Sequence, residues 1–68
     1  MKLKILRVMA RMTQAEAAAA AGVTQAALSD WEKGKYKPSQ KARDKLAKAY
    51  NVSLEEIVNA IEDADADE

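Results

Sequence analysis

Apolar residues recur every three or four positions through most of this chain, which is the spacing of one face of an α-helix. Near the N-terminus the repeat is formed by Leu3, Leu6 and Met9, with Ala10 four positions after Leu6. This spacing predicts a helix over residues 2–11 with Met9 in the core. No segment shows the alternating pattern of a strand, so the chain is predicted to be all-α.

Local start and stop signals divide the chain into five helices. Thr13 with Glu16, and Ser53 with Glu56, have the spacing of capping boxes that begin a helix. Glycine or asparagine follows three of the apolar stretches and can end a helix in the left-handed conformation. The predicted helices cover about residues 2–11, 13–21, 24–33, 40–50 and 53–61.

The last seven residues differ in composition from the rest of the chain. Residues 62–68 read EDADADE and show no apolar periodicity. Such a segment lacks the apolar surface needed to join a core. We therefore expect one domain over residues 1–61, followed by a disordered acidic tail over residues 62–68.

The zero net charge of the chain hides two opposite halves. Residues 1–50 hold all eleven Lys and Arg with four acids, a net charge of +7. Residues 51–68 hold seven acids and no base, a net charge of −7. A basic body favours a nucleic-acid partner, whereas charge that serves only solubility is the alternative interpretation.

Several classes of function find no support in the sequence. The chain has no cysteine and no histidine, so neither a disulfide nor an ordinary metal site is expected. We also expect no catalytic residue, no cofactor and no small-molecule substrate, because little room remains for a pocket. No apolar run is long enough to span a membrane, and a cytoplasmic location is expected.

The second and third predicted helices form the informative stretch. The turn around Gly22 is too short to let the two helices lie antiparallel, so a near right angle is expected, as in a helix-turn-helix motif. Leu28 and Trp31 of the third helix should face the core, as should Met12 before the second. The opposite side carries small and amide side chains that suit the major groove, although an ordinary solvated face is the alternative.

The order of these residues resembles the Cro/repressor-type helix-turn-helix family from about residue 3 to residue 61. The matching segments are residues 12–14, 18–19, 22–24, 28–34, 37–39, 46–47 and 51–57. The resemblance implies a five-helix, lambda-repressor-like DNA-binding domain with the helix-turn-helix at its second and third helices. It further implies a phage or bacterial regulator of transcription that binds a double-stranded DNA operator, usually as a dimer, and we interpret the chain as a repressor.

The resemblance also implies roles for individual residues. The base-reading positions are Gln25, Ala26, Ser29 and Asp30. The phosphate-binding positions are Gln14, Thr24, Lys33, Lys35, Tyr36 and Lys37. Asp30 departs from expectation, because a carboxylate near phosphates is repelled unless it accepts a hydrogen bond from cytosine.

Two further expectations concern contacts within and between chains. Arg7 and Glu32 match a structural ion pair of the family, although two separate surface charges are the alternative. A homodimer through the fifth helix would use apolar positions that the core leaves over, chosen from Val52, Leu54, Val58 and Ile61. The favoured alternative is that these residues belong entirely to the core. The rival function is a protein-interaction module on the same fold, an antitoxin or anti-repressor, which would suit Asp30 and the acidic tail.

Overall fold

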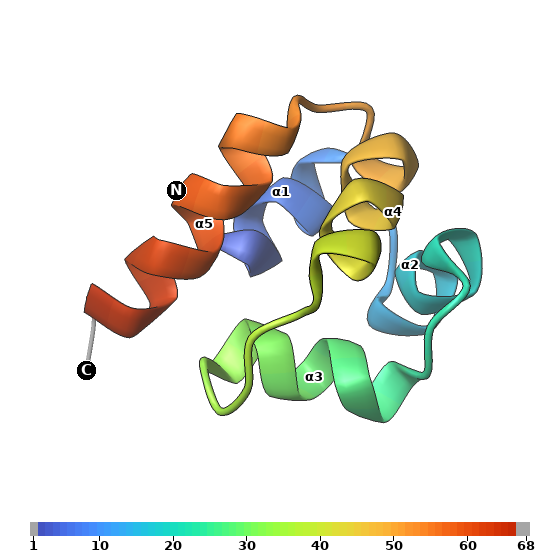
Figure 1. The fold of residues 1–68 in the computed structure, drawn as a ribbon. Coiled ribbons are helices and arrows are strands. Elements are labelled where there is room, and N and C mark those ends of the chain that lie inside the picture. The colour runs from blue at the N-terminus through green and yellow to red at the C-terminus, as the bar shows by residue number, and fades with distance from the viewer. Residues whose placement is uncertain (1, 67–68) are drawn as a thin grey trace.

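The computed structural model describes residues 2–66 of the 68-residue chain, with side chains described for residues 2–62. Within this part the chain forms helices and no strand, which confirms the all-α prediction (Figure 1). The helices are α1 (Leu3–Met9), α2 (Gln14–Ala21), α3 (Gln25–Lys33), α4 (Gln40–Tyr50) and α5 (Leu54–Ala66). Their order is that of the five-helix, lambda-repressor-like fold that the sequence predicts.

Side-chain caps begin the helices where the sequence predicts them. The hydroxyl of Thr13 accepts a hydrogen bond from the Glu16 N–H at 3.1 Å, and the Glu16 carboxylate accepts one from the Thr13 N–H at 2.9 Å. Hydrogen bonds to the Glu16 carboxylate from the Thr13 backbone N–H and, second, from the Thr13 side chain lower the pKa of Glu16, because they favour the ionised form. Thr24 and Ser39 likewise accept from the first turns of α3 and α4. N–H groups that have no partner within their helix are thereby satisfied.

The first four helices end on one backbone motif. A residue at positive φ follows each helix, and the next N–H donates to a carbonyl five residues earlier. Glycine and asparagine tolerate this conformation, and Gly22 adopts it at φ 69° between α2 and α3. The four positive-φ residues are Arg11, Gly22, Gly34 and Asn51.

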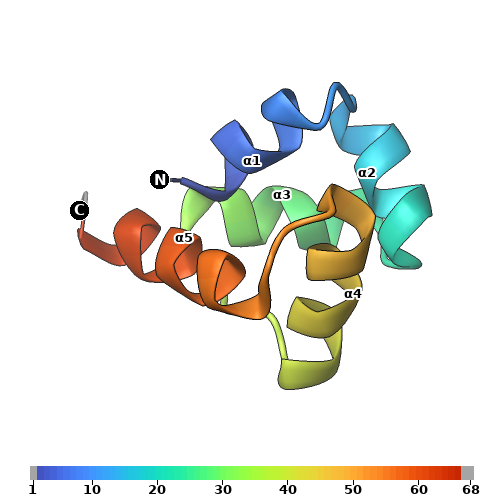
Figure 2. The same ribbon diagram turned by 90° about the horizontal axis from the view of Figure 1, so that it is seen from above.

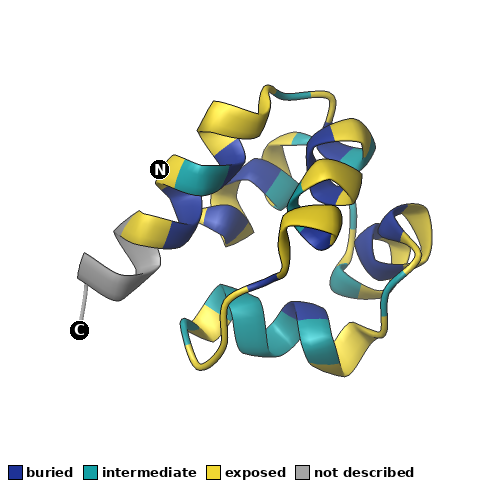
Figure 3. Ribbon diagram, in the orientation of Figure 1, coloured by how far each residue is buried: buried dark blue, intermediate teal, exposed yellow. Residues whose placement is uncertain are grey.

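The core lies where all five helices meet. Its largest fully buried side chains are Leu3, Leu28, Leu46 and Ile57, from four different helices. Burial of each such side chain contributes roughly 1.5–3 kcal/mol. The remaining helix, α2, contributes only alanines, so it approaches its neighbours closely. Figure 3 shows these buried positions on the inward sides of the helices.

Met9 is a correction to the predicted core, because its side chain is 65% exposed. Leu3 and Leu6 are buried and Ala10 packs against the core. At ~100° per residue these three share one narrow arc, and Met9 lies roughly 90° away from its centre. A spacing of three residues therefore moves Met9 off the buried face. Met12 does pack against the core, as expected.

The C-terminal helix is longer than predicted. We expected an end near Ile61 and a disordered tail, whereas α5 continues to Ala66. Residues 62–66 contain no glycine or proline to stop a helix, and two of them are alanine, the best helix former. The expected disorder of residues 67 and 68 lies outside the described residues.

Arg11 provides a test of the helix-ending motif. Its φ of 61° is costly for a residue with a Cβ atom. We expect Arg11→Gly to raise the free energy of unfolding by about 1 kcal/mol, measured by urea denaturation. Arg11→Ala removes the same charge but keeps the Cβ atom, so it should leave stability nearly unchanged. Equal stabilisation by both variants would show that charge, not backbone conformation, is responsible.

Candidate nucleic-acid interface

The α2–turn–α3 unit presents one helix along an edge of the molecule. Gly22 and the cap at Thr24 turn the chain sharply between the two helices. In Figure 1, α3 lies along one side of the domain, and the other helices cover its inner face. Leu28 anchors that inner face in the core with no measurable exposure. The outer side of α3 is available for a ligand.

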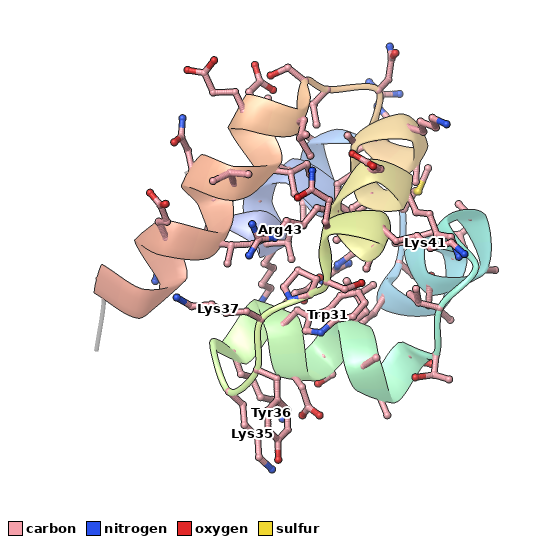
Figure 4. All side chains as sticks on the ribbon, in the orientation of Figure 1. Trp31, Lys35, Tyr36, Lys37, Lys41 and Arg43 are labelled. Carbon is pink, nitrogen blue, oxygen red and sulfur yellow. The ribbon has the colours of Figure 1, made fainter. Side chains whose placement is uncertain are left out.

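Trp31 belongs to the inner face as well. It packs against the hydrophobic core and projects from α3 toward α4 (Figure 4). This placement agrees with the expectation that Trp31 is a core residue and not a base-stacking one. Its contact with the core holds the C-terminal half of α3 against the domain.

The predicted base-reading residues occupy two environments on α3. Gln25 and Ala26, in its first turn, are exposed. Ser29 and Asp30, one turn later, are partly buried. The more exposed end of α3 is therefore its N-terminal end, as Figure 3 also shows. No side chain larger than glutamine occupies this end, so a flat or convex ligand surface could approach it closely.

A largely buried ion pair joins α1 to the end of α3. The Arg7 Nε donates to the Glu32 Oε2 at 2.7 Å, and the Arg7 Nη2 donates to Oε1 at 3.4 Å. The side chains are 11% and 6% exposed, so the two charges are a pair and not separate surface groups. The Arg7 Nη1 also donates to the Met12 carbonyl at 2.9 Å. The hydrogen bond to Glu32 raises the pKa of Arg7, against the opposing effect of burial, so the guanidinium remains charged.

Two glutamines extend this pair to the N-terminus of α3. The Gln14 Nε2 donates to the Glu32 Oε1 at 3.2 Å, and the Gln25 Nε2 donates to the Gln14 Oε1 at 3.3 Å. We call the connected side chains Arg7, Glu32, Gln14 and Gln25 the polar chain. It contains residues expected separately as an ion pair, a phosphate contact and a base contact. The tertiary structure joins these residues in one hydrogen-bonded set.

A polar hollow of about 570 Å³ lies beside this chain. Its lining residues are Lys4, Arg7, Thr13, Gln14, Ser29, Glu32 and Lys33. Because Arg7 neutralises Glu32, the lysines give the hollow a positive charge. Sequence reasoning missed Lys4. The signal that could have found it is its place three residues before Arg7, on the same side of the helix.

The side chains of the basic loop after α3, residues 35–37, point in two directions. Lys35 and Tyr36 extend together beyond α3, with the lysine Nζ 5.6 Å from the centre of the tyrosine ring (Figure 4). Tyr36 is 60% exposed. Lys37 instead projects toward α5 in the same view. The Arg43 Nε donates to the Pro38 carbonyl at 3.2 Å and holds the end of the loop against α4.

Two other kinds of site are not indicated. Within the described residues, no cluster of three or more acidic side chains is arranged to hold a metal ion. No helix in that part of the chain is long and apolar enough to cross a membrane.

Comparisons with a family model and with known proteins agree on one family. A family model described as helix-turn-helix matches residues 3–57. A protein of Methanocaldococcus jannaschii named as an uncharacterized HTH-type transcriptional regulator is 41% identical over 56 residues, which cover 82% of this chain and 85% of that protein. One of Archaeoglobus fulgidus with the same description is 39% identical over 56 residues, 82% of this chain and 79% of its own.

No solved structure gives a significant match. The family match nevertheless includes α1 to α4 whole and the start of α5, and thus the entire α2–turn–α3 unit. The chain belongs to the helix-turn-helix family of the Cro/repressor type.

Proposed function

We propose that this chain is a sequence-specific regulator of transcription that binds double-stranded DNA with α3 in the major groove. Both relatives bear the name of HTH-type transcriptional regulators. The observation that best supports the proposal is the polar chain, which holds the Gln25 amide at the exposed end of α3. An amide fixed in this way loses little rotamer freedom when it binds a base, because its orientation is already set.

The exposed side of α3 supplies the base contacts. The Gln25 amide can pair with N6 and N7 of adenine, and the Ala26 methyl can meet a thymine methyl. Ser29 can bond to several bases and so adds less discrimination. Asp30 accepts from the amino group of cytosine and repels other groups, so it acts mainly by excluding wrong sequences.

Positive and polar groups on both sides of α3 supply the contacts with the phosphate backbone of the DNA. Gln14, Lys4 and Lys33 line the polar hollow on one side. Lys35 and Tyr36 extend beyond the end of α3. A duplex seated on α3 thus meets phosphate-binding groups on either flank, which fixes its register. The Thr24 hydroxyl, which accepts from the Ala27 N–H, retains its own hydrogen for a phosphate oxygen.

Regulation follows from occupancy. A domain bound at an operator excludes other proteins from the same stretch of DNA, so we assign this chain the role of a repressor.

One α3 reads only a few base pairs, and a two-fold pair of domains spaced by one helical turn, ~34 Å, doubles the number of base pairs that are read. Lys37, which projects away from Lys35 and Tyr36, contributes to the general positive charge.

Replacement of Gln25 tests the base contact. We expect Gln25→Ala to weaken binding to a duplex selected from a random pool by roughly 1–3 kcal/mol, with binding to scrambled DNA unchanged. Fluorescence anisotropy measures both affinities. Gln40→Ala removes an exposed amide from α4 and should change neither. If no duplex is selected from the pool, the protein-interaction function becomes the better explanation.

Replacement of Lys35 tests the phosphate contact. Lys35→Ala should weaken binding to selected and scrambled duplexes alike, because a phosphate contact is independent of sequence. The slope of log K against log salt should become shallower by about 0.9. Lys48→Ala, on the last turn of α4, is the matched control and should leave the slope as it is. A slope unaltered by Lys35→Ala would refute the assignment.

The ion pair allows stability and specificity to be separated. Glu32→Gln leaves Arg7 without a counter-charge in a largely buried position and should cost about 3 kcal/mol of stability, measured by urea denaturation. The double variant Arg7→Met with Glu32→Leu replaces the pair by apolar side chains and should recover most of that loss. It still removes the acceptor of Gln14, so discrimination between selected and scrambled DNA should stay reduced. Full recovery of discrimination would show that the polar chain does not position Gln25.

A further inference from the structure

A groove of about 420 Å³ lies where α1, the end of α4 and the start of α5 meet. Figure 1 shows the connection between α4 and α5 at the top of the domain and α3 at the bottom, and Figure 2 looks down on the upper end. The sequence predicts little room for a pocket, but this volume falls within the range of about 300–1,000 Å³ that small-molecule sites occupy. The lining residues are Leu6, Met9, Ala10, Tyr50, Val52, Glu56 and Asn59.

The walls of the groove are mainly apolar. Leu6 and Tyr50, at 5% and 4% exposed, form its inner side, and Met9, at 65%, forms its outer side. Val52, one of the apolar positions considered for a homodimer, lines the groove, whereas Ile61 is 4% exposed and belongs to the core. An apolar molecule in the groove would cover side chains that the core leaves partly open.

Tyr50 gives the groove an aromatic inner wall. Its hydroxyl oxygen is buried and has no hydrogen-bond partner among the described residues. Burial raises the pKa of this hydroxyl to about 12, the Glu32 carboxylate raises it further and the Arg7 guanidinium opposes the rise. The hydroxyl is therefore uncharged and lies within electrostatic reach of the ion pair. A molecule in the groove meets the ring of Tyr50, because the hydroxyl is covered by the protein.

The rim of the groove is negatively charged. Glu56 is the one charged residue among the described residues that line it. Its side chain is exposed, and its carboxylate forms no ion pair with a described residue. Asn59, three residues later on the same side of α5, adds an amide oxygen. A positive group that donates hydrogen bonds is complementary to this rim, and an anion is not.

We propose that this groove binds a small aromatic molecule that bears one ammonium group. The aromatic part lies against the Tyr50 ring and the Met9 thioether, both of which form favourable contacts with aromatic rings in addition to apolar burial. The ammonium group stays at the rim and donates to the Glu56 carboxylate and the Asn59 amide oxygen. A neutral analogue keeps only the apolar contacts, and a carboxylate analogue is repelled.

This site is separate from the side of the domain assigned to DNA. The groove and the polar hollow have no lining residue in common. They also lie toward opposite ends of the domain, since the hollow includes residues of α3. The inference thus goes beyond the proposed function, and its test requires no DNA.

Titration of the whole chain with 4-phenylbutylamine, followed by ¹H–¹⁵N NMR, tests the proposal. We expect saturable shifts of the Met9, Ala10 and Asn59 amide signals, with those of Gln25 and Ala26 unmoved. The dissociation constant should be on the order of 1 mM, as is usual for so small a ligand. 4-Phenylbutanol should bind more weakly, and 4-phenylbutyrate most weakly, because the three molecules share one apolar part and differ in the charge of the head group.

Removal of the rim charge provides the second arm. Glu56→Gln should weaken binding of the amine by about fivefold, the upper end for an exposed ion pair, and leave the binding of 4-phenylbutanol unchanged. Glu55→Gln removes the same charge from the neighbouring position, which does not line the groove, and should have no effect.

Filling the groove provides the third arm. Ala10→Leu should weaken binding of both the amine and the alcohol by about tenfold or more, because the larger side chain occupies the site. Ala20→Leu makes the same change at an exposed position of α2 and should leave binding intact. Circular dichroism establishes that the variants fold, and the Glu56→Gln arm decides the question if Ala10→Leu does not.

Three results would overturn the proposal. The first is the absence of saturable shifts at about 20 mM amine, well above the expected dissociation constant. The second is equal affinity for the amine and the carboxylate analogue. The third is an equal effect of Glu56→Gln and Glu55→Gln, which would show that the amine responds to the net charge of α5 and not to the rim of the groove.

Discussion

The ion pair between Arg7 and Glu32 connects parts of this domain that apolar packing alone holds weakly. A small domain buries too little apolar surface to fix every helix by packing. Here a carboxylate at the end of α3 takes hydrogen bonds from α1 and α2 together. Since removal of either partner leaves a largely buried charge, the pair constrains all three helices to one arrangement. The Gln14 and Gln25 amides acquire their orientation from that arrangement.

Helix α3 contributes side chains both to the core and to the proposed DNA contact. Leu28 and Trp31 attach α3 to the domain, while its first turn stays exposed. In the DNA complex that we propose, short side chains at the exposed end allow close approach to a duplex, and the basic groups beside it supply affinity without reading sequence. Under the proposed function, Asp30 lowers affinity and raises selectivity, because phosphate contacts alone do not distinguish sequences.

The fold brings the basic N-terminal part of the chain and its acidic C-terminal part into contact. The basic α1 and the acidic α5 pack against each other around a groove lined mainly by apolar side chains. The proposed DNA-binding side is basic and suits an acidic partner.

Features that depend only on neighbours within about four residues can be predicted from the sequence. Thr13, Thr24 and Ser39 begin helices, and Gly22 and Asn51 end them, because capping and left-handed stops are local interactions. The family resemblance gave separate expectations for Gln14, for Gln25 and for the Arg7–Glu32 pair.

The connection of these side chains into one hydrogen-bonded chain is visible only in the fold. The fold also determines which arc of α1 faces the core, which leaves Met9 outside, and that Lys37 lies apart from Lys35 and Tyr36. Each of these outcomes depends on how helices distant in sequence are oriented, and periodicity within one helix does not contain that information.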